Sequence, residues 1–334
     1  MYDTYIGTTT GVYRLHDGEA EPLGLADERV WALHAWRDGG DTALLAGSYG
    51  NGLYRSADGG KTWSRADEGL TASAFRCIGP DPLNPGALLA GTEPARLYRS
   101  ADGGRTWHEL TGITQVPGYE QWYLPYSPRA GAVRNVYAPP GSTGRLFASV
   151  EVGGLLTSDD GGATWTCPPV IEDEDIHFIT GHPDDPDLLY AALGYASVTH
   201  RGQGGEPRRF GGVARSRDGG RTWRKLETDY TRAVIVPPSR HDLLLAGPSP
   251  NVGRGGRIVV SADGGDTWTP AAGGIETPMP DMVELFVAAP DDTIWAITSG
   301  GRLFRATPGE WSWRSALPAG ADLEAQSVSF VPAG

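Results

Sequence analysis

One eight-residue motif occurs five times in this chain and constrains its fold more than any other feature. The motif reads Ser-x-Asp-Gly-Gly-x-Thr-Trp, and a short apolar run precedes each copy. Its paired glycines supply the positive φ angles that other residues resist, and its Ser and Asp side chains accept hydrogen bonds from nearby backbone N–H groups. This pattern is typical of a β-hairpin with a glycine-dependent turn. The copies lie at 56–63, 100–107, 158–165, 216–223 and 261–268.

The spacing of the motifs predicts the unit of structure. From one motif aspartate to the next, the intervals are 44, 58, 58 and 45 residues. They indicate a repeat of about 45 residues with insertions, which is the period of a four-stranded propeller blade. Two degenerate copies, at 11–18 and 302–311, keep the apolar run and bring the total to seven.

Two further strands in each repeat support seven blades. A strand of small and apolar residues precedes each motif run, and an earlier strand is usually ended by proline. The seventh such early strand occurs at 326–332, so we expect it to complete the blade begun by residues 1–25 and to remove exposed sheet edges. The sequence therefore predicts one all-β domain, a seven-bladed propeller of four-stranded antiparallel blades. The predicted blades are 325–334 with 1–25, 29–70, 74–112, 133–170, 175–228, 231–272 and 282–318, with insertions at 111–132, 196–211 and 248–256.

Composition limits the partners of the chain. Its 334 residues include 28 basic and 41 acidic ones, for a net charge of −13, which disfavours nucleic acid as a partner. No stretch of 18 apolar residues and no leader-like start are present, so we expect no membrane association. We expect a cytoplasmic monomer, or a secreted protein if a leader has been removed.

Cofactor motifs are missing from the sequence. There is no glycine-rich phosphate loop, no zinc spacing and no calcium loop, so we predict neither a cofactor nor a metal. The two cysteines, Cys77 and Cys167, are expected to be reduced and buried.

The repeated motif resembles the Asp-box (BNR) repeats of sialidases, photosystem II assembly factors and other bacterial propellers. The resemblance covers nearly the whole chain. It implies that the boxes lie on one rim and that a ligand would bind at the opposite rim, where first strands begin and second strands end. One fold hosts many chemistries, so the resemblance predicts the binding face better than it predicts the reaction.

Charged residues occupy the second position of the first strands on that face. Strand positions near the axis should be small or apolar, yet three arginines, a histidine and a glutamate occur here. Converging guanidinium groups are typical of carboxylate or phosphate sites. The alternative is an ion-pair network that only fills the channel. The seven positions are Trp31, Arg76, Arg134, His177, Arg232, Glu284 and Ser327.

A candidate acid–base cluster lies beside these positions. Two carboxylates, Glu93 and Glu151, lie at the ends of second strands. Asp175 lies two residues before His177, and Tyr230 lies two residues before Arg232. Side chains alternate along a strand, so residues two apart share a face. We expect the following residues to be the catalytic group, although a buried core histidine with a packing tyrosine is the alternative: Glu151, Asp175, His177 and Tyr230.

Aromatic residues in the first insertion add to the predicted site. Trp122 and Tyr123 lie in an aromatic-rich stretch at 119–126 and are placed to stack on a sugar ring, or else to form a lid that packs on itself. Long loops on one rim usually serve function. The predicted ligand-binding residues are Arg76, Glu93, Trp122, Tyr123, Arg134, Arg232 and Glu284.

These residues favour a small anionic or sugar-like ligand in a central pocket. The resemblance implies a hydrolase of the glycosidase type, or a lyase. A strict sialidase is disfavoured, because that family's Arg-Ile-Pro motif is absent and sialidases have six blades. The alternative function is a non-catalytic propeller that binds a protein partner. A deep pocket with converging charges would favour the small ligand, and a flat rim would favour the protein.

Overall fold

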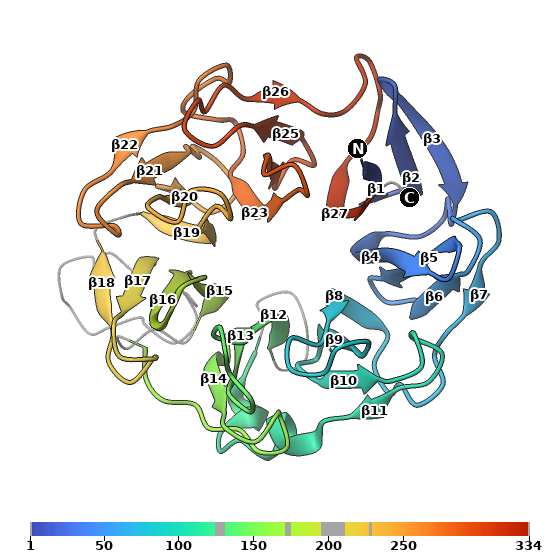
Figure 1. Cartoon of the computed structure of the whole chain (residues 1–334), viewed down its shortest axis with the longest axis horizontal. Coiled ribbons are helices and arrows are strands. Elements are labelled where there is room, and N and C mark those ends of the chain that lie inside the picture. The colour runs from blue at the N-terminus through green and yellow to red at the C-terminus, as the bar shows by residue number, and fades with distance from the viewer. Residues whose placement is uncertain (1, 124–130, 171–174, 195–210, 227–228, 333–334) are drawn as a thin grey trace.

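The chain folds into seven blades arranged as a closed ring around a central channel (Figure 1). The computed structural model describes residues 2–123, 131–170, 175–194, 211–226 and 229–332. The predicted all-β, seven-bladed propeller is confirmed. In each blade the first strand faces the channel and the later strands follow outward in order (Figure 1).

Six of the blades are four-stranded antiparallel sheets in the described part of the chain. Blade 1 contains β27 (Ala325–Pro332), β1 (Tyr2–Thr8), β2 (Gly11–His16) and β3 (Glu19–Gly24). Blade 2 contains β4 (Val30–Asp38), β5 (Asp41–Ser48), β6 (Leu53–Ser56) and β7 (Ser64–Arg65). Blade 3 contains β8 (Ala74–Pro80), β9 (Leu88–Glu93), β10 (Leu97–Ser100) and β11 (His108–Glu109).

The remaining blades follow the same order. Blade 4 contains β12 (Ala132–Tyr137), β13 (Leu146–Glu151) and β14 (Gly154–Ser158), and a single bridge between Thr157 and Thr166 stands where its fourth strand would run. Blade 5 contains β15 (Ile176–His182), β16 (Asp185–Leu193), β17 (Gly212–Ser216) and β18 (Arg224–Leu226). Blade 6 contains β19 (Tyr230–Ile235), β20 (Leu244–Ser249), β21 (Val259–Ser261) and β22 (Thr269–Pro270). Blade 7 contains β23 (Val283–Ala288), β24 (Ile294–Thr298), β25 (Leu303–Ala306) and β26 (Arg314–Ser315).

Strand β27 closes the ring, as the sequence predicts. It pairs antiparallel with β1, with Tyr2 opposite Pro332 and Ile6 opposite Val328. The two ends of the chain therefore lie in one sheet (Figure 1). Without this pairing, β1 would be the open edge of a three-stranded sheet.

The eight-residue motif forms the turn between third and fourth strands. In the copy at 158–165, the Ser158 hydroxyl donates to Asp160 Oδ1 at 2.8 Å and accepts from the Gly162 N–H at 2.9 Å. Asp160 also accepts from the backbone N–H and the hydroxyl of Thr164, at 2.9 and 2.5 Å. Gly161 and Gly162 have φ of 74° and 93°, which side chains resist. The glycine-dependent turn predicted from the motif is thus present, closed by its own Ser and Asp.

Tryptophans of the motifs fill the seams between neighbouring blades. The Trp63 indole packs on blade 1 and donates to the Leu23 carbonyl at 2.8 Å. The Trp313 indole packs on blade 6 and donates to the Ala271 carbonyl at 2.7 Å. Trp311 and Trp313 of the degenerate copy in blade 7 both lie in the hydrophobic cluster at this seam, and it is Trp313 that forms the hydrogen bond across the seam. Trp107, Trp165, Trp223 and Trp268 pack in the same way on the blade before their own.

Two short 3₁₀ helices connect blades 3 and 4, η1 (Thr111–Gln115) and η2 (Tyr119–Gln121). Neither helix in the described part of the chain has the length and hydrophobicity needed to cross a membrane. Of the predicted insertions, 248–256 is described, whereas 124–130 of the first insertion and nearly all of 196–211 lie outside the described residues. Cys77 is half-buried and Cys167 is exposed, so the expectation that both are buried was wrong.

Candidate functional site

A β-bulge in every blade places one side chain in the channel. In the pairing of β4 with β5, Val30 and Ala32 face consecutive partners, so Trp31 is the extra residue. The same single-residue shift occurs at the start of the first strand in the five blades that follow. A bulged residue leaves the ladder and is re-aimed, which is why bulges are common beside active sites. The side chains that these bulges direct into the channel are those of Trp31, Arg76, Arg134, His177, Arg232 and Glu284.

The bulge of blade 1 corrects one predicted position. The register of β1 with β27 shifts where Gly7 faces Ser327 and Thr8 faces Ala325, which leaves Gln326 as the extra residue. Ser327 is buried, and its hydroxyl donates to the Val30 carbonyl at 3.3 Å. Gln326 therefore takes the seventh place in the ring of bulge residues, where Ser327 was expected.

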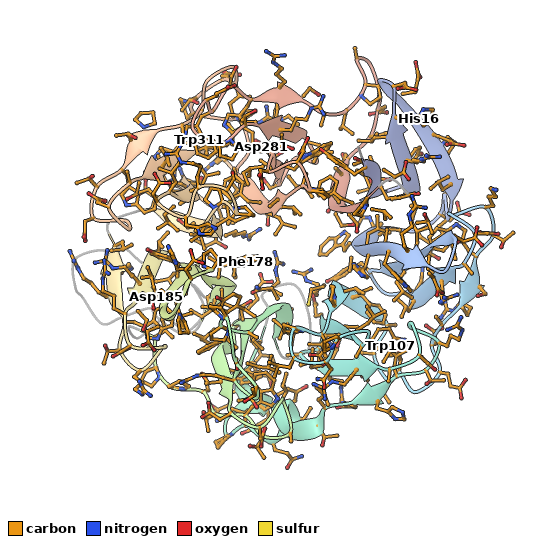
Figure 2. The ribbon with its side chains drawn as sticks, viewed as in Figure 1. His16, Trp107, Phe178, Asp185, Asp281 and Trp311 are labelled. Carbon is orange, nitrogen blue, oxygen red and sulfur yellow. The ribbon has the colours of Figure 1, made fainter. Side chains whose placement is uncertain are left out.

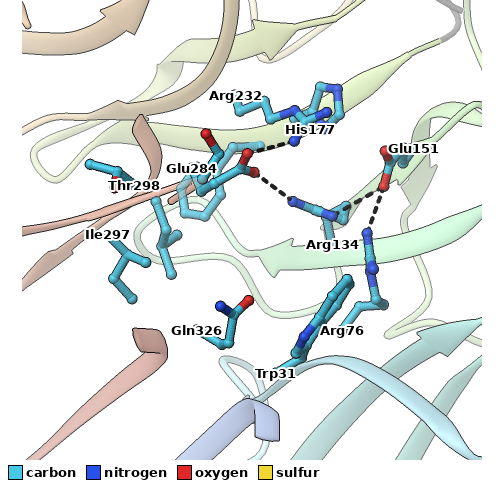
Figure 3. Close-up of a pocket in the computed structure, with 13 residues that line it drawn as sticks. Trp31, Arg76, Arg134, Glu151, His177, Arg232, Glu284, Ile297, Thr298 and Gln326 are labelled. Atoms are coloured by element: carbon cyan, nitrogen blue, oxygen red, sulfur yellow. Dashed lines mark hydrogen bonds and ion pairs between the residues drawn. The ribbon is translucent and has the colours of Figure 1, made fainter. Parts of the chain in front are cut away.

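All seven bulge residues line one cavity of about 350 Å³ at the mouth of the channel (Figure 3). Glu151, at the end of β13, also lines it. On the side of blade 7 the wall carries no charge apart from Glu284, and it presents Leu285, Ile297, Thr298 and Ser299. The cavity thus has a charged side, formed by blades 3 to 6, and a side of apolar groups and hydroxyls.

A chain of ion pairs links the charged side chains (Figure 3). Glu151 Oε2 lies 2.9 Å from Arg76 Nη2 and 3.1 Å from Arg134 Nη1. Glu284 continues the chain, at 3.6 Å from Arg134 Nη2 and 2.5 Å from Arg232 Nη1. Each arginine therefore already has a carboxylate partner, and a ligand would meet guanidinium and carboxylate groups in alternation rather than three bare cations.

The side chains of this ion-pair network differ in how deeply they are buried. The Arg76 side chain is only 3% exposed, whereas those of Arg134, Arg232 and Glu284 are 19–20% exposed. The Arg76 guanidinium lies against the aromatic ring of Trp31, 4.5 Å from its centroid. On the side away from the cavity, its Nη1 lies 3.6 Å from Oε2 of Glu93. The groups that a ligand can reach are therefore those around Glu284, and the Arg76 end serves mainly as a buried support.

Glu151 stays ionised in this setting. Burial disfavours its charged form, but the guanidinium of Arg134, followed by His177 and Arg76, outweighs burial and holds the pKa of the Glu151 carboxyl well below its usual range. The next residue, Val152, has a φ of 60°, and its N–H donates to Asp175 Oδ1 at 3.3 Å. A β-branched residue rarely adopts that conformation, so the backbone is held in a strained form beside the carboxylate.

The predicted acid–base residues meet behind the cavity wall. His177 Nε2 lies 2.9 Å from the Tyr230 hydroxyl and 3.4 Å from Asp175 Oδ2. The Tyr230 hydroxyl also accepts a hydrogen bond from Arg232 Nε at 2.9 Å. Burial raises the pKa of Tyr230, so it remains a neutral phenol. Among the four residues in these contacts, His177 and Arg232 line the cavity, whereas Asp175 and Tyr230 do not. Asp175 and Tyr230 are thus placed to orient His177 and not to touch a ligand.

Three potential metal ligands approach one another in this cluster. Oxygen or nitrogen atoms of Glu151, Asp175 and His177 lie within 4.8 Å of one another. Glu151, however, is already paired with the guanidinium groups of Arg76 and Arg134. Two adjacent cations disfavour a divalent ion electrostatically, so these residues fit an ion-pair network better than a metal centre.

The two aromatic residues of the first insertion do not line the cavity. The Trp122 ring is buried in the core of blade 4, in contact with Tyr119 at a centroid distance of 5.1 Å. Tyr123 is 55% exposed. The sequence left two roles open for Trp122, stacking on a ligand or packing within its own segment, and its contacts favour the second. Glu93 is buried as well, with the Tyr49 hydroxyl 3.1 Å away, and it supports Arg76 from behind.

Similarity to known proteins agrees with this architecture. The pattern that defines the BNR/Asp-box repeat matches residues 54–65. The chain is a β-propeller that carries a match to the Asp-box repeat at these residues. No protein of curated function matches its sequence significantly.

Several solved structures resemble this propeller. A GH74 xyloglucanase from Xanthomonas campestris has a TM-score of 0.67 at 20% identity, over 98% of this chain and 52% of that one. An ancestral GH74 enzyme has a TM-score of 0.59 at 13% identity, over 90% of this chain and 38% of that one. A YCF48 structure with a bound D1 peptide has a TM-score of 0.50 at 16% identity, over 86% and 81%. At these identities the likeness shows the fold alone, and the propeller spans only about a third to a half of the two GH74 chains.

Proposed function

We propose that the central pocket of this propeller binds a small, neutral, polyhydroxylated ligand of the sugar type. The observation that carries the proposal is the partly exposed row Arg134–Glu284–Arg232 in the wall of the cavity. A sugar hydroxyl can accept a hydrogen bond from a guanidinium and donate one to a carboxylate, so both charged groups keep a hydrogen-bond partner when it binds. The volume of about 350 Å³ is in the range of small-ligand pockets.

The charges of the wall favour a neutral ligand over an anion. The cavity is lined by three arginines and two glutamates, and two further carboxylates, Glu93 and Asp175, lie directly behind it. A carboxylate ligand would have to compete with Glu284 for Arg232 Nη1, which is 2.5 Å away. Neutral hydroxyl groups avoid this competition and can also use Thr298, Ser299 and Gln326 on the other side.

A panel of matched ligands tests the proposal. We expect neutral mono- and disaccharides to raise the Tm of the wild-type protein and to give saturable heats in calorimetry, and their oxidised acids to bind at least tenfold more weakly. Arg232→Gln should weaken sugar binding at least tenfold, whereas Arg314→Ala, on the exposed outermost strand of blade 7, should not change it. Binding of the sugar acids alone would support an anion site instead, and no binding of either kind would reject a small-ligand pocket of this chemistry.

Hydrolysis of a glycoside is the second candidate function. It is favoured by the placement of His177 in the cavity wall, with Tyr230 and Asp175 on its Nε2 atom. A histidine side chain can act as a general acid or base, and the ionised Glu151 would stabilise positive charge that develops on a sugar ring. We expect His177→Gln to abolish any turnover of chromogenic glycosides while sugar binding persists. Turnover that is unchanged in this variant would exclude His177 as the acid–base group.

A further inference from the structure

One seam of the propeller, between blades 7 and 1, has no motif tryptophan in the described part of the chain. At the other six seams an indole from a motif packs on the preceding blade, in the described part of the chain. At the seam between blades 7 and 1, the corresponding turn of blade 1 is reduced to Asp17 and Gly18, and β3 begins directly at Glu19. The residues that would carry the Asp-Gly-Gly-x-Thr-Trp sequence are missing from this turn.

A groove of about 890 Å³ lies where that indole would pack. Leu15 and the short turn at 16–19 form one side, and Trp295 with the segment 315–319 of blade 7 forms the other. His16 marks this seam at the outer edge of the ring (Figure 2). Trp295 is almost fully buried, and Phe330 lies against it at a centroid distance of 5.2 Å. The apolar part of the groove is formed by Leu15, Ala316 and Leu317, and Arg305 lies over the ring of the buried Trp295 at 5.8 Å from its centroid.

The rim of the groove is acidic. Asp3, Asp17, Glu19 and Asp291 line it, against two arginines, Arg14 and Arg305. Arg14 Nη2 pairs with Asp3 Oδ1 at 2.7 Å, so these two charges compensate each other and leave Asp17, Glu19 and Asp291 against Arg305. Positive charge on an incoming segment would therefore be attracted to this edge.

We propose that this groove is a docking site for a partner protein that inserts a tryptophan side chain flanked by basic residues. Six equivalent seams are each filled by a motif indole, and the seventh has the space and an apolar surface for one. A second copy of the chain is a poor donor, because all eleven tryptophans lie in the described residues and none is exposed. The proposal does not depend on the ligand of the central pocket, which lies at the opposite side of the blades.

A peptide taken from the propeller itself is a suitable probe. Residues 54–65, Tyr-Arg-Ser-Ala-Asp-Gly-Gly-Lys-Thr-Trp-Ser-Arg, combine a motif tryptophan with two arginines and a lysine. We expect this synthetic peptide to bind the wild-type protein saturably in NMR titration, and the same peptide with Trp63→Ala to bind at least tenfold more weakly. Equal binding of the two peptides, or no saturable binding of either, would overturn the proposal.

Two protein variants test whether the peptide binds in the groove. Leu317→Arg introduces a large cation into the apolar wall and should weaken peptide binding at least tenfold. Val252→Arg is the matched control, because Val252 is already 46% exposed in a loop that does not line this groove. Peptide binding by Leu317→Arg at wild-type strength would show that the peptide binds elsewhere and would reject the groove as its site.

A graft tests the missing indole directly. Residues 15–18 are replaced by the eight residues of 56–63, which restores a complete motif to blade 1. We expect the grafted tryptophan to be protected from acrylamide quenching, the Tm to rise by about 2 °C or more, and peptide binding to be lost because the groove is occupied. A folded graft with an exposed tryptophan and an unchanged Tm would show that the seam does not accept an indole. If the graft does not fold, the comparison of Leu317→Arg with Val252→Arg decides the question.

Discussion

The guanidinium of Arg76 lies 2.9 Å from the carboxylate of Glu151, although the two residues are 75 positions apart in sequence and belong to different blades. Both side chains are almost completely buried, at 3% and 7% exposed. Glu151 also holds Arg134, so one carboxylate joins three strands around the channel mouth. The site is therefore part of what holds blades 3 and 4 together.

Replacing this carboxylate should destabilise the fold. Glu151→Gln leaves the buried Arg76 without one of its carboxylate partners, and removing one partner of a buried ion pair costs about 3 kcal/mol. We expect the free energy of unfolding, measured by urea titration, to fall by about that amount. Glu276→Gln, at an exposed loop position, is the control and should change it little. A loss no larger than that of the control would show that Glu151 is not a structural centre.

The contribution of Glu151 should depend on pH in a definite direction. The pKa of its carboxyl is lowered in the folded protein, whereas an unfolded glutamate has a pKa of about 4.3. Its stabilisation is fully present above about pH 4.3 and is lost as the pH falls toward the folded value. The difference in stability between wild type and Glu151→Gln should thus shrink below about pH 4.3. A difference that stays constant down to pH 3 would contradict the lowered pKa.

Two neighbouring aspartates of one motif should behave differently. Asp160 accepts hydrogen bonds from Ser158 and Thr164, and the Thr164 hydroxyl lowers the pKa of Asp160 to about 2. Asp159, which precedes it, is 80% exposed and lies 3.6 Å from Arg145. We expect Asp160→Asn to lower the Tm and Asp159→Asn to leave it nearly unchanged. Sugar binding should be the same in both variants, since the turn lies on the rim opposite the cavity; equal Tm values would argue against the turn as a structural clamp.

Adjacent residues of β27 should give opposite phenotypes. Gln326 is the bulge residue and lines the cavity, whereas the Ser327 hydroxyl bonds the Val30 carbonyl inside the sheet region. Gln326→Ala should weaken ligand binding several-fold and leave the Tm unchanged. Ser327→Ala should lower the Tm by a small amount and leave affinity unchanged. The reverse pattern in calorimetry and thermal melting would show that the bulge is assigned to the wrong residue.

Much of the fold could be predicted because the motif carries its own structural reasons. Asp160 and Ser158 close a turn within eight residues, and the glycines permit it, so each copy signals a hairpin without reference to the rest of the chain. Ring closure by β27 followed from counting strands. The tryptophan of blade 7 that bonds across the seam could not be predicted, because Trp311 and Trp313 are two residues apart and only the hydrogen bond to Ala271 separates them.

The candidate site could be predicted only in part. Charged residues at buried strand positions, such as Arg134 and Glu284, are conspicuous in sequence, and the structure brings them into one cavity. Gln326 was missed because the strand begins at Ala325, one residue before the predicted start at 326, so that Ser327 was expected to be its second residue. Thr298 and Ser299 look like ordinary strand-end residues, and Trp122 gives no sequence signal that its ring is used by the core.

The seven bulges have a consequence for how such a pocket can change. Each bulge residue stands outside the hydrogen-bond ladder, so its side chain is specified by the cavity and not by the pairing of the strands. Exchanging the bulge residues outside the Glu151 ion pairs would alter the chemistry of the mouth while the blades keep their register. Gln326 is the position best suited to randomisation in the laboratory, because it lines the cavity without contributing to the Glu151 support, whereas Trp31 packs on Arg76.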